Sequence, residues 1–200
     1  MGQFFELTFL TDDRIEQDRL RGKLAELGVT GKKWDGHLKG GGYGSMTWAR
    51  SVKPLDLVVT NYGGNWNEHF VQVGFDSAAL RSLATLVDRK HLVDEFLVMG
   101  SHLWQAFPFY EDALSPEEEG WFLYSMRQSN AKEIQRSLPL NKYATFLSVD
   151  AALLVKPKQW VPQTHPNSTI TSLERQSLLV IWDASIEGLA RFLSTEFSIN

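Results

Sequence analysis

Hydrophobic and polar residues alternate in two runs of the chain, residues 55–60 and 70–75, on either side of a polar turn. The apolar positions that share one face of these runs are Leu55, Leu57, Val59, Val71, Val73 and Phe75. A period of two is typical of strands with one buried face. Gly63 and Gly64 in the turn tolerate positive φ. The pattern therefore predicts a β-hairpin over residues 55–75, around which the sheet is built.

Before the hairpin, the pattern predicts a strand and then a helix. Residues 4–10 (FFELTFL) suit a strand, and Thr11 with the following aspartates gives an N-cap and an acidic first turn for the helix. The leucines at one face of that helix are Leu20, Leu24 and Leu27. Gly28 ends it.

Glycine-rich and helical stretches flank the hairpin. Residues 31–50 are rich in glycine and carry three large aromatics, which predicts a long loop with aromatic anchors. Asp76 or Ser77 begins a helix whose apolar stripe is Ala79, Leu80, Leu83, Leu86 and Val87. Residues 91–107 fit either a second helix interrupted near Gly100 or a short strand followed by a loop, because their periodicity favours neither.

A capping box marks the start of the next predicted helix. Ser115, Pro116 and Glu118 supply the cap, the first helical position and the reciprocal acid. The remaining predicted elements are a short helix near residues 129–134, strands over residues 143–149, 151–155 and 177–182, an extended loop over residues 156–171, and a final helix from Ser185 with the stripe Ile186, Leu189, Ala190, Leu193 and Phe197.

Strands near both ends, a central hairpin and helices between them predict an α+β fold. We expect a single antiparallel or mixed sheet with a central hairpin, covered by helices. The length of 200 residues and the 43% of hydrophobic residues are those of an ordinary globular chain, so one domain over residues 1–200 is expected. Residues 99–140 would form a helical and aromatic subregion within it.

Composition excludes several classes of protein. The chain has no cysteine, so it has neither disulfides nor a thiolate nucleophile. It has no run of about 18 apolar residues and no signal-peptide pattern, which predicts a cytoplasmic protein without a membrane span. A formal charge of -4 argues against direct binding of nucleic acid, because that binding requires cations to neutralise phosphates.

The short motifs of catalysis and cofactor binding are all incomplete. In a run that resembles a phosphate-binding loop, Glu26 stands where the first glycine belongs and Lys33 where a hydroxyl residue would hold magnesium. Ser45 follows a glycine but does not lie in a nucleophile elbow. His91 and Asp94 share a helical face, yet a metal site needs further ligands. We therefore expect no metal, no other cofactor and no catalytic residue.

Acidic and aromatic residues concentrate between residues 104 and 124. Five carboxylates fall within nine residues there, among many aromatics. Acids at a helix start and aromatics in a core explain this composition, but acids that steer a basic partner and aromatics that anchor it explain it too. Under the second interpretation the partner-binding residues are Trp104, Phe109, Tyr110, Glu111, Asp112, Glu117 and Glu119, with Trp66 on the hairpin turn as a further contact.

The order of these segments resembles that of a known family. The resemblance lies in the first strand and helix followed by Lys33 and Trp34, in the hairpin over residues 55–75, and in the late Trp160 of the run KQWV. In these segments the chain resembles bacterial immunity proteins of polymorphic toxin systems, and among them the immunity protein 52 group. The usual toxin of that group looks like a restriction-endonuclease-type nuclease. The resemblance implies a small inhibitor that binds and blocks one toxin; residues 99–140 depart from the family's pattern.

The function expected from the sequence is a non-catalytic one: an immunity protein that binds and neutralises a cognate bacterial toxin or effector protein and uses no cofactor. A nuclease effector is one candidate for that toxin. Two alternatives stay open. One is a small hydrolase-like enzyme with an aromatic pocket formed by Trp34, Tyr43, Trp48 and Trp66. The other is a structural or adaptor subunit.

Overall fold

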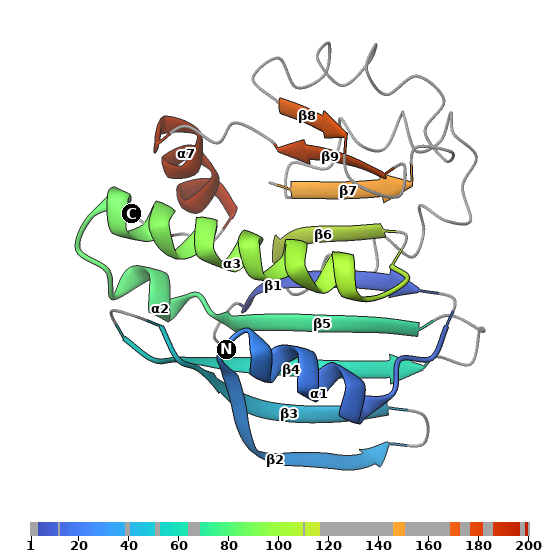
Figure 1. The fold of residues 1–200 in the computed structure, drawn as a ribbon. Helices are drawn as coiled ribbons and strands as arrows, with labels where there is room; N and C mark the ends of the chain where they lie inside the picture. The colour runs from blue at the N-terminus through green and yellow to red at the C-terminus, as the bar shows by residue number, and fades with distance from the viewer. Residues whose placement is uncertain are drawn as a thin grey trace.

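An antiparallel sheet with helices on one side makes up the part of the chain that the structure, a computed structural model, describes (Figure 1). That part comprises residues 4–11, 13–38, 41–50, 53–63, 69–109, 111–116, 146–150, 169–172, 177–181, 186–196 and 199. Its strands are β1 (Phe4–Thr11), β2 (Val29–Leu38), β3 (Gly41–Trp48), β4 (Leu55–Gly63), β5 (His69–Asp76), β6 (Glu111–Pro116), β7 (Phe146–Asp150), β8 (Thr169–Ser172) and β9 (Ser177–Ile181). Its helices are α1 (Gln17–Glu26), α2 (Ala78–Arg81), α3 (Leu86–Ala106) and α7 (Ile186–Glu196).

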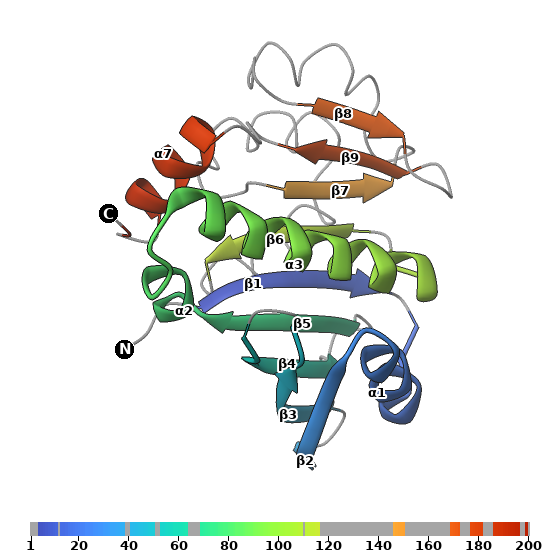
Figure 2. The same ribbon diagram turned by 60° about the vertical axis from the view of Figure 1, so that its left-hand side comes forward.

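The strands follow the order β2-β3-β4-β5-β1-β6-β7-β9-β8, and every neighbouring pair runs antiparallel. The α+β class and the hairpin predicted over residues 55–75 are thus confirmed: β4 pairs with β5, with Val59 opposite Val73. The first strand is confirmed too and lies beside β5, with Leu7 opposite Val73. Figures 1 and 2 show α1, α2 and α3 together on one side of the sheet.

The long loop predicted over residues 31–50 is wrong, because β2 and β3 form a second hairpin there. In β3, Gly44, Met46 and Trp48 are buried while Ser45 and Thr47 are exposed, which is the period of two of a strand. Because Gly44 has no side chain, the alternation of apolar and polar residues in β3 is not visible in the sequence. Two register shifts further interrupt the pairing of β2 with β3 and make the pattern of β2 irregular.

The helix predicted from Asp76 or Ser77 through Val87 is wrong in extent, since α2 ends at Arg81 and a new helix starts after Thr85. The Thr85 hydroxyl accepts a hydrogen bond of 3.1 Å from the backbone N–H of Asp88 and so caps α3. Val87 is 66% exposed and does not belong to a buried stripe. Leu83 is half-buried beside the core.

Of the two alternatives for residues 91–107, the helix is the correct one, but it has no interruption near Gly100: α3 runs continuously over 21 residues. At Gly100 the helix lies close to β1: a Cβ added there would be 2.6 Å from Cδ1 of Leu7. One glycine costs a helix only about 1 kcal/mol, so the helix tolerates it. Here glycine allows close packing and is not a helix end.

Gly22 and Gly100 make a matched test of this packing. Gly22 lies in α1 with open space around its missing Cβ, so Gly22→Ala is expected to raise the free energy of unfolding by up to about 1 kcal/mol. Gly100→Ala gains the same propensity but must displace the fully buried Leu7, and we expect it to be worse than Gly22→Ala by about 2 kcal/mol. Urea denaturation of both variants measures the difference, and equal stabilisation would contradict the close approach.

Two boundaries of helices also differ from the prediction. α1 begins at Gln17 rather than beside the aspartates, because the Thr11 hydroxyl accepts the N–H of Asp13 at 3.1 Å and forms a separate turn. Its end at Gly28 is confirmed, with φ of 78°. Ser115 and Pro116, predicted to cap a helix, belong to β6 instead, and proline is tolerated at the end of a strand. The helix predicted to follow them lies outside the described residues.

Three of the elements predicted for the C-terminal part of the chain are confirmed. β7, β9 and α7 confirm the strands predicted over residues 143–149 and 177–182 and the final helix. β8 contradicts the end of the loop predicted over residues 156–171, because its backbone pairs with β9. The strand predicted over residues 151–155 and the helix near residues 129–134 lie outside the described residues.

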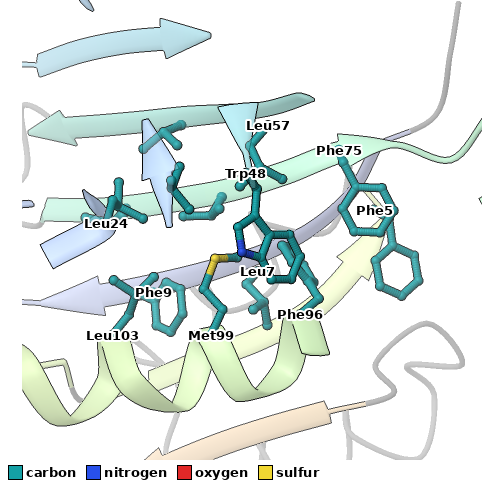
Figure 3. Packing of buried hydrophobic residues seen from close by; sticks show 14 of the residues in the cluster. Phe5, Leu7, Phe9, Leu24, Trp48, Leu57, Phe75, Phe96, Met99 and Leu103 are labelled. Atoms are coloured by element: carbon teal, nitrogen blue, oxygen red, sulfur yellow. The ribbon is translucent and has the colours of Figure 1, made fainter. Parts of the chain in front are cut away.

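The core lies between the sheet and α3, and Figure 3 shows its side chains from close by. Phe96 of α3 contacts rings from three strands: the centroids of Phe75, Phe5 and Trp48 lie 5.0, 6.1 and 6.3 Å from that of Phe96. At the C-terminal end of α3, Arg19 donates to the carbonyl of Ala106 at 3.1 Å and so joins α1 to α3. These contacts leave the opposite face of the sheet free of the described helices.

Candidate functional site

Two of the residues predicted to anchor a partner are core residues instead. Trp104 is 3% exposed and Phe109 4% exposed, so neither can contact a partner. The Phe109 ring stacks on Phe9 of β1 with a centroid distance of 4.8 Å. The prediction failed because an aromatic cluster in the sequence suits a core as well as a surface. In α3, Trp104 continues the buried face that includes Phe96 and Gly100.

Of the other predicted partner residues, the structure describes only the backbone of Glu111 and Asp112. Glu111 and Asp112 lie in β6, where their Cα atoms pair with those of Leu10 and Phe9, and their side chains are outside the described part. Trp66, Tyr110, Glu117 and Glu119 also fall outside it. Their roles stay predictions.

One residue of the aromatic pocket predicted for the enzyme alternative, Trp48, is buried in the core. Trp48 is 7% exposed and packs towards Phe96, and the guanidinium of Arg50 covers its ring at 5.4 Å from the centroid. Trp48 is therefore a core residue. The side chains of Trp34, Tyr43 and Trp66 lie outside the described part.

The face of the sheet opposite α1 and α3 is the most accessible regular surface of β3, β4 and β5. Its side chains alternate along each strand with those of the core. We call them the open sheet face: Ser45, Thr47, Asp56, Val58, Thr60, Phe70 and Gln72. Ser45, Thr47 and Asp56 are exposed, and the other four are half-buried.

The register of the strands places these side chains in rows across the sheet. Ser45 lies opposite Val58, and Thr60 lies opposite Gln72. Thr47 lies opposite Asp56, and its hydroxyl donates to a carboxylate oxygen of Asp56 at 3.3 Å. Because neighbouring strands hold each row, the shape of this face is set before any partner arrives.

A buried polar cluster borders the open sheet face on the side of β1. Nε2 of Gln72 donates to Oε1 of Glu6 at 3.1 Å and to the Thr8 hydroxyl at 3.3 Å. Glu6 and Thr8 are 6% and 2% exposed. Buried polar groups are costly unless they are hydrogen-bonded, so this cluster holds Gln72 in one orientation.

Gly74 makes room for Cβ of Glu6, the acidic residue of that cluster. A Cβ at Gly74 would lie 2.8 Å from Cβ of Glu6 and 3.2 Å from the backbone oxygen of Phe5. The glycine is thus needed for the close pairing of β5 with β1 at this point. Through this pairing, β5, which carries part of the open sheet face, is held against β1 in the middle of the sheet.

Sequence reasoning passed over this face although the signal was present. The residues that alternate with the buried positions of the first hairpin include Asp56, Val58, Thr60 and Gln72, and they follow directly from the predicted period of two. The missing part was β3, whose Ser45 and Thr47 extend the face only once residues 31–50 are known to be strands.

Comparison with protein-family models, with curated proteins and with solved structures finds no match to this chain. Among the described residues, no helix is both long enough and apolar enough to cross a membrane. Nor do three or more histidine, aspartate or glutamate side chains of this part gather in a way that could hold a metal ion.

Proposed function

We propose that this chain is a non-catalytic binding protein that binds and neutralises a cognate bacterial toxin. The observation that carries the proposal is the open sheet face, a preformed surface of mixed polar and apolar side chains on rigid strands. The order of segments that resembles immunity proteins supports the same function. The partner is expected to be a protein rather than nucleic acid or membrane.

The composition of the open sheet face suits a protein interface. Val58, Thr47 and Thr60 are β-branched and have few rotamers to lose, so ordering them against a partner costs little entropy. Phe70 adds an aromatic surface that is half-accessible. A flat surface of this kind gains affinity from shape complementarity, with a few buried contacts providing most of the energy.

Charge favours a toxin with a basic surface, such as a nuclease that binds phosphates. The chain carries a formal charge of -4, and Asp56 is an exposed acid on the open sheet face. We propose that Glu111, Asp112, Glu117 and Glu119 add to this negative field, since acids accelerate association with a cationic partner. Tyr110 and Trp66 remain proposed anchors, whereas Trp104 and Phe109 are excluded by their burial.

The primary test is complex formation with the product of the neighbouring gene. Size-exclusion chromatography and calorimetry are expected to show a stable complex, and the mixture should lose the toxin's activity. If association is steered by charge, its rate constant should fall as salt rises while dissociation changes little. Absence of a complex would refute the proposed function.

Arginine substitutions locate the binding surface. Thr47→Arg together with Val58→Arg places two long cations on the open sheet face, and we expect the complex to weaken by about 2 kcal/mol or more. Val98→Arg is the matched control, because Val98 is 56% exposed on the outer surface of α3. Calorimetry should show near-normal affinity for that control. If only Val98→Arg weakens the complex, the toxin binds the helical side instead.

A further inference from the structure

A pocket of about 430 Å³ lies where α7 packs against the first turn of α3. This volume falls within the range of roughly 300–1,000 Å³ that is typical of small-molecule sites. It lies on the helical side of the molecule, away from the open sheet face. Ile199, the final residue of the described part, also lines the pocket, and its N–H donates to the carbonyl of Leu193 at 3.0 Å.

Two arginines and several apolar side chains line the pocket. Arg89 comes from α3 and Arg191 from α7, while Leu86, Ala190 and Ile199 provide apolar walls. None of the described lining residues is acidic. Asp88 and Glu187, which lie on the same two helices, are exposed and do not line it. The described lining thus brings two guanidinium groups and no carboxylate to the pocket.

The placement of Arg89 is fixed by its surroundings. The residue is only 9% exposed, and its Nε donates to the carbonyl of Leu83 at 3.2 Å. Both arginines also interact with other groups of the chain. A guanidinium has five N–H donors in a rigid plane, so it can bind a carboxylate while it keeps other contacts.

We propose that this pocket binds a small organic anion, with its carboxylate between Arg89 and Arg191 and its hydrocarbon part against Leu86, Ala190 and Ile199. The paired arginines favour a planar oxyanion, and the apolar walls favour a short hydrocarbon chain over a bare ion. This site is independent of toxin binding, because it uses neither the strands nor the residues of the open sheet face.

The test uses hexanoate as the anion and hexanamide as its uncharged counterpart. Hexanoate is expected to bind the full-length protein with a dissociation constant on the order of 1 mM or tighter, and hexanamide roughly tenfold more weakly or worse, because a hydrogen bond to a charged group is stronger. In an NMR titration, the amide signals of Leu86, Ala190 and Ser194 should shift. Equal affinity for the two compounds, no binding of hexanoate, or shifts confined to other residues would overturn the proposal.

Removal of one cation provides the second measurement. Arg191 is exposed, so Arg191→Gln is expected to fold normally and to bind hexanoate about tenfold more weakly. Arg21→Gln is the matched control, because Arg21 is an exposed arginine on α1, away from the pocket. Its affinity for hexanoate should be unchanged. Unchanged affinity in Arg191→Gln, or an equal loss in both variants, would also overturn the proposal.

Discussion

Replacement of Phe96 by alanine is expected to lower the free energy of unfolding by about 3–5 kcal/mol, the largest loss that we expect from a single core substitution. Phe96 is fully buried in the middle of α3. Its ring meets that of Phe75 edge-on, at 5.0 Å and 83°, and also contacts Phe5 and Trp48. Alanine would leave a cavity where the helix joins three strands.

Two comparisons make this prediction specific. Phe96→Leu retains most of the volume and should cost clearly less than Phe96→Ala. Val98→Ala removes apolar atoms from the same helix but at a site that is 56% exposed, so its effect should stay within about 0.5 kcal/mol. Urea denaturation of the three variants measures the order. If Phe96→Ala lowered the free energy of unfolding no more than Val98→Ala, the packing of Phe96 between α3 and the sheet would be contradicted.

The elements that could be predicted from the sequence are those whose own residues determine them. The hairpin of β4 and β5 has regular alternation on both arms, and the stripe of α7 follows the helical period, with Leu193 fully buried. Gly28 adopts the positive φ that its position at the end of α1 suggests. In these cases local pattern and tertiary packing agree.

The elements that could not be predicted depend on distant contacts. β2 and β3 contain too many glycines to show alternation, and pairing of β3 with β4 is what makes them strands. Gly100 resembles a helix break until Leu7 is seen against it. The same holds for the candidate site: Trp104 is buried on the inner face of α3 and Phe109 stacks on Phe9 of β1, and no window of sequence contains these contacts.

The second large effect is expected at the ion pair that joins the end of β3 to α3. Arg50 donates from both Nε and Nη2 to Oε2 of Glu95, and its Nε lies 2.6 Å from that oxygen. The side chain of Arg50 is 9% exposed and that of Glu95 is 28% exposed. Glu95→Ala leaves the arginine largely buried without this carboxylate, and we expect a loss of about 3 kcal/mol.

Asp94→Ala is the control on the same helix. Asp94 accepts from Lys90 at 2.6 Å, but its side chain is 50% exposed, and exposed pairs contribute only about 0.2–1 kcal/mol. Thermal and urea denaturation should therefore separate the two variants by about 2 kcal/mol. Equal effects would mean that water reaches Arg50 as freely as it reaches Lys90.

A double substitution distinguishes the cost of a stranded charge from the value of the pair itself. Replacing both partners, Arg50→Met with Glu95→Leu, removes the pair without leaving a buried cation, and apolar replacements of buried pairs are often close to neutral. The double variant is therefore expected to be more stable than Glu95→Ala alone. If it were less stable, the stacking of Arg50 on Trp48, at 5.4 Å, would be the interaction that holds this connection against α3.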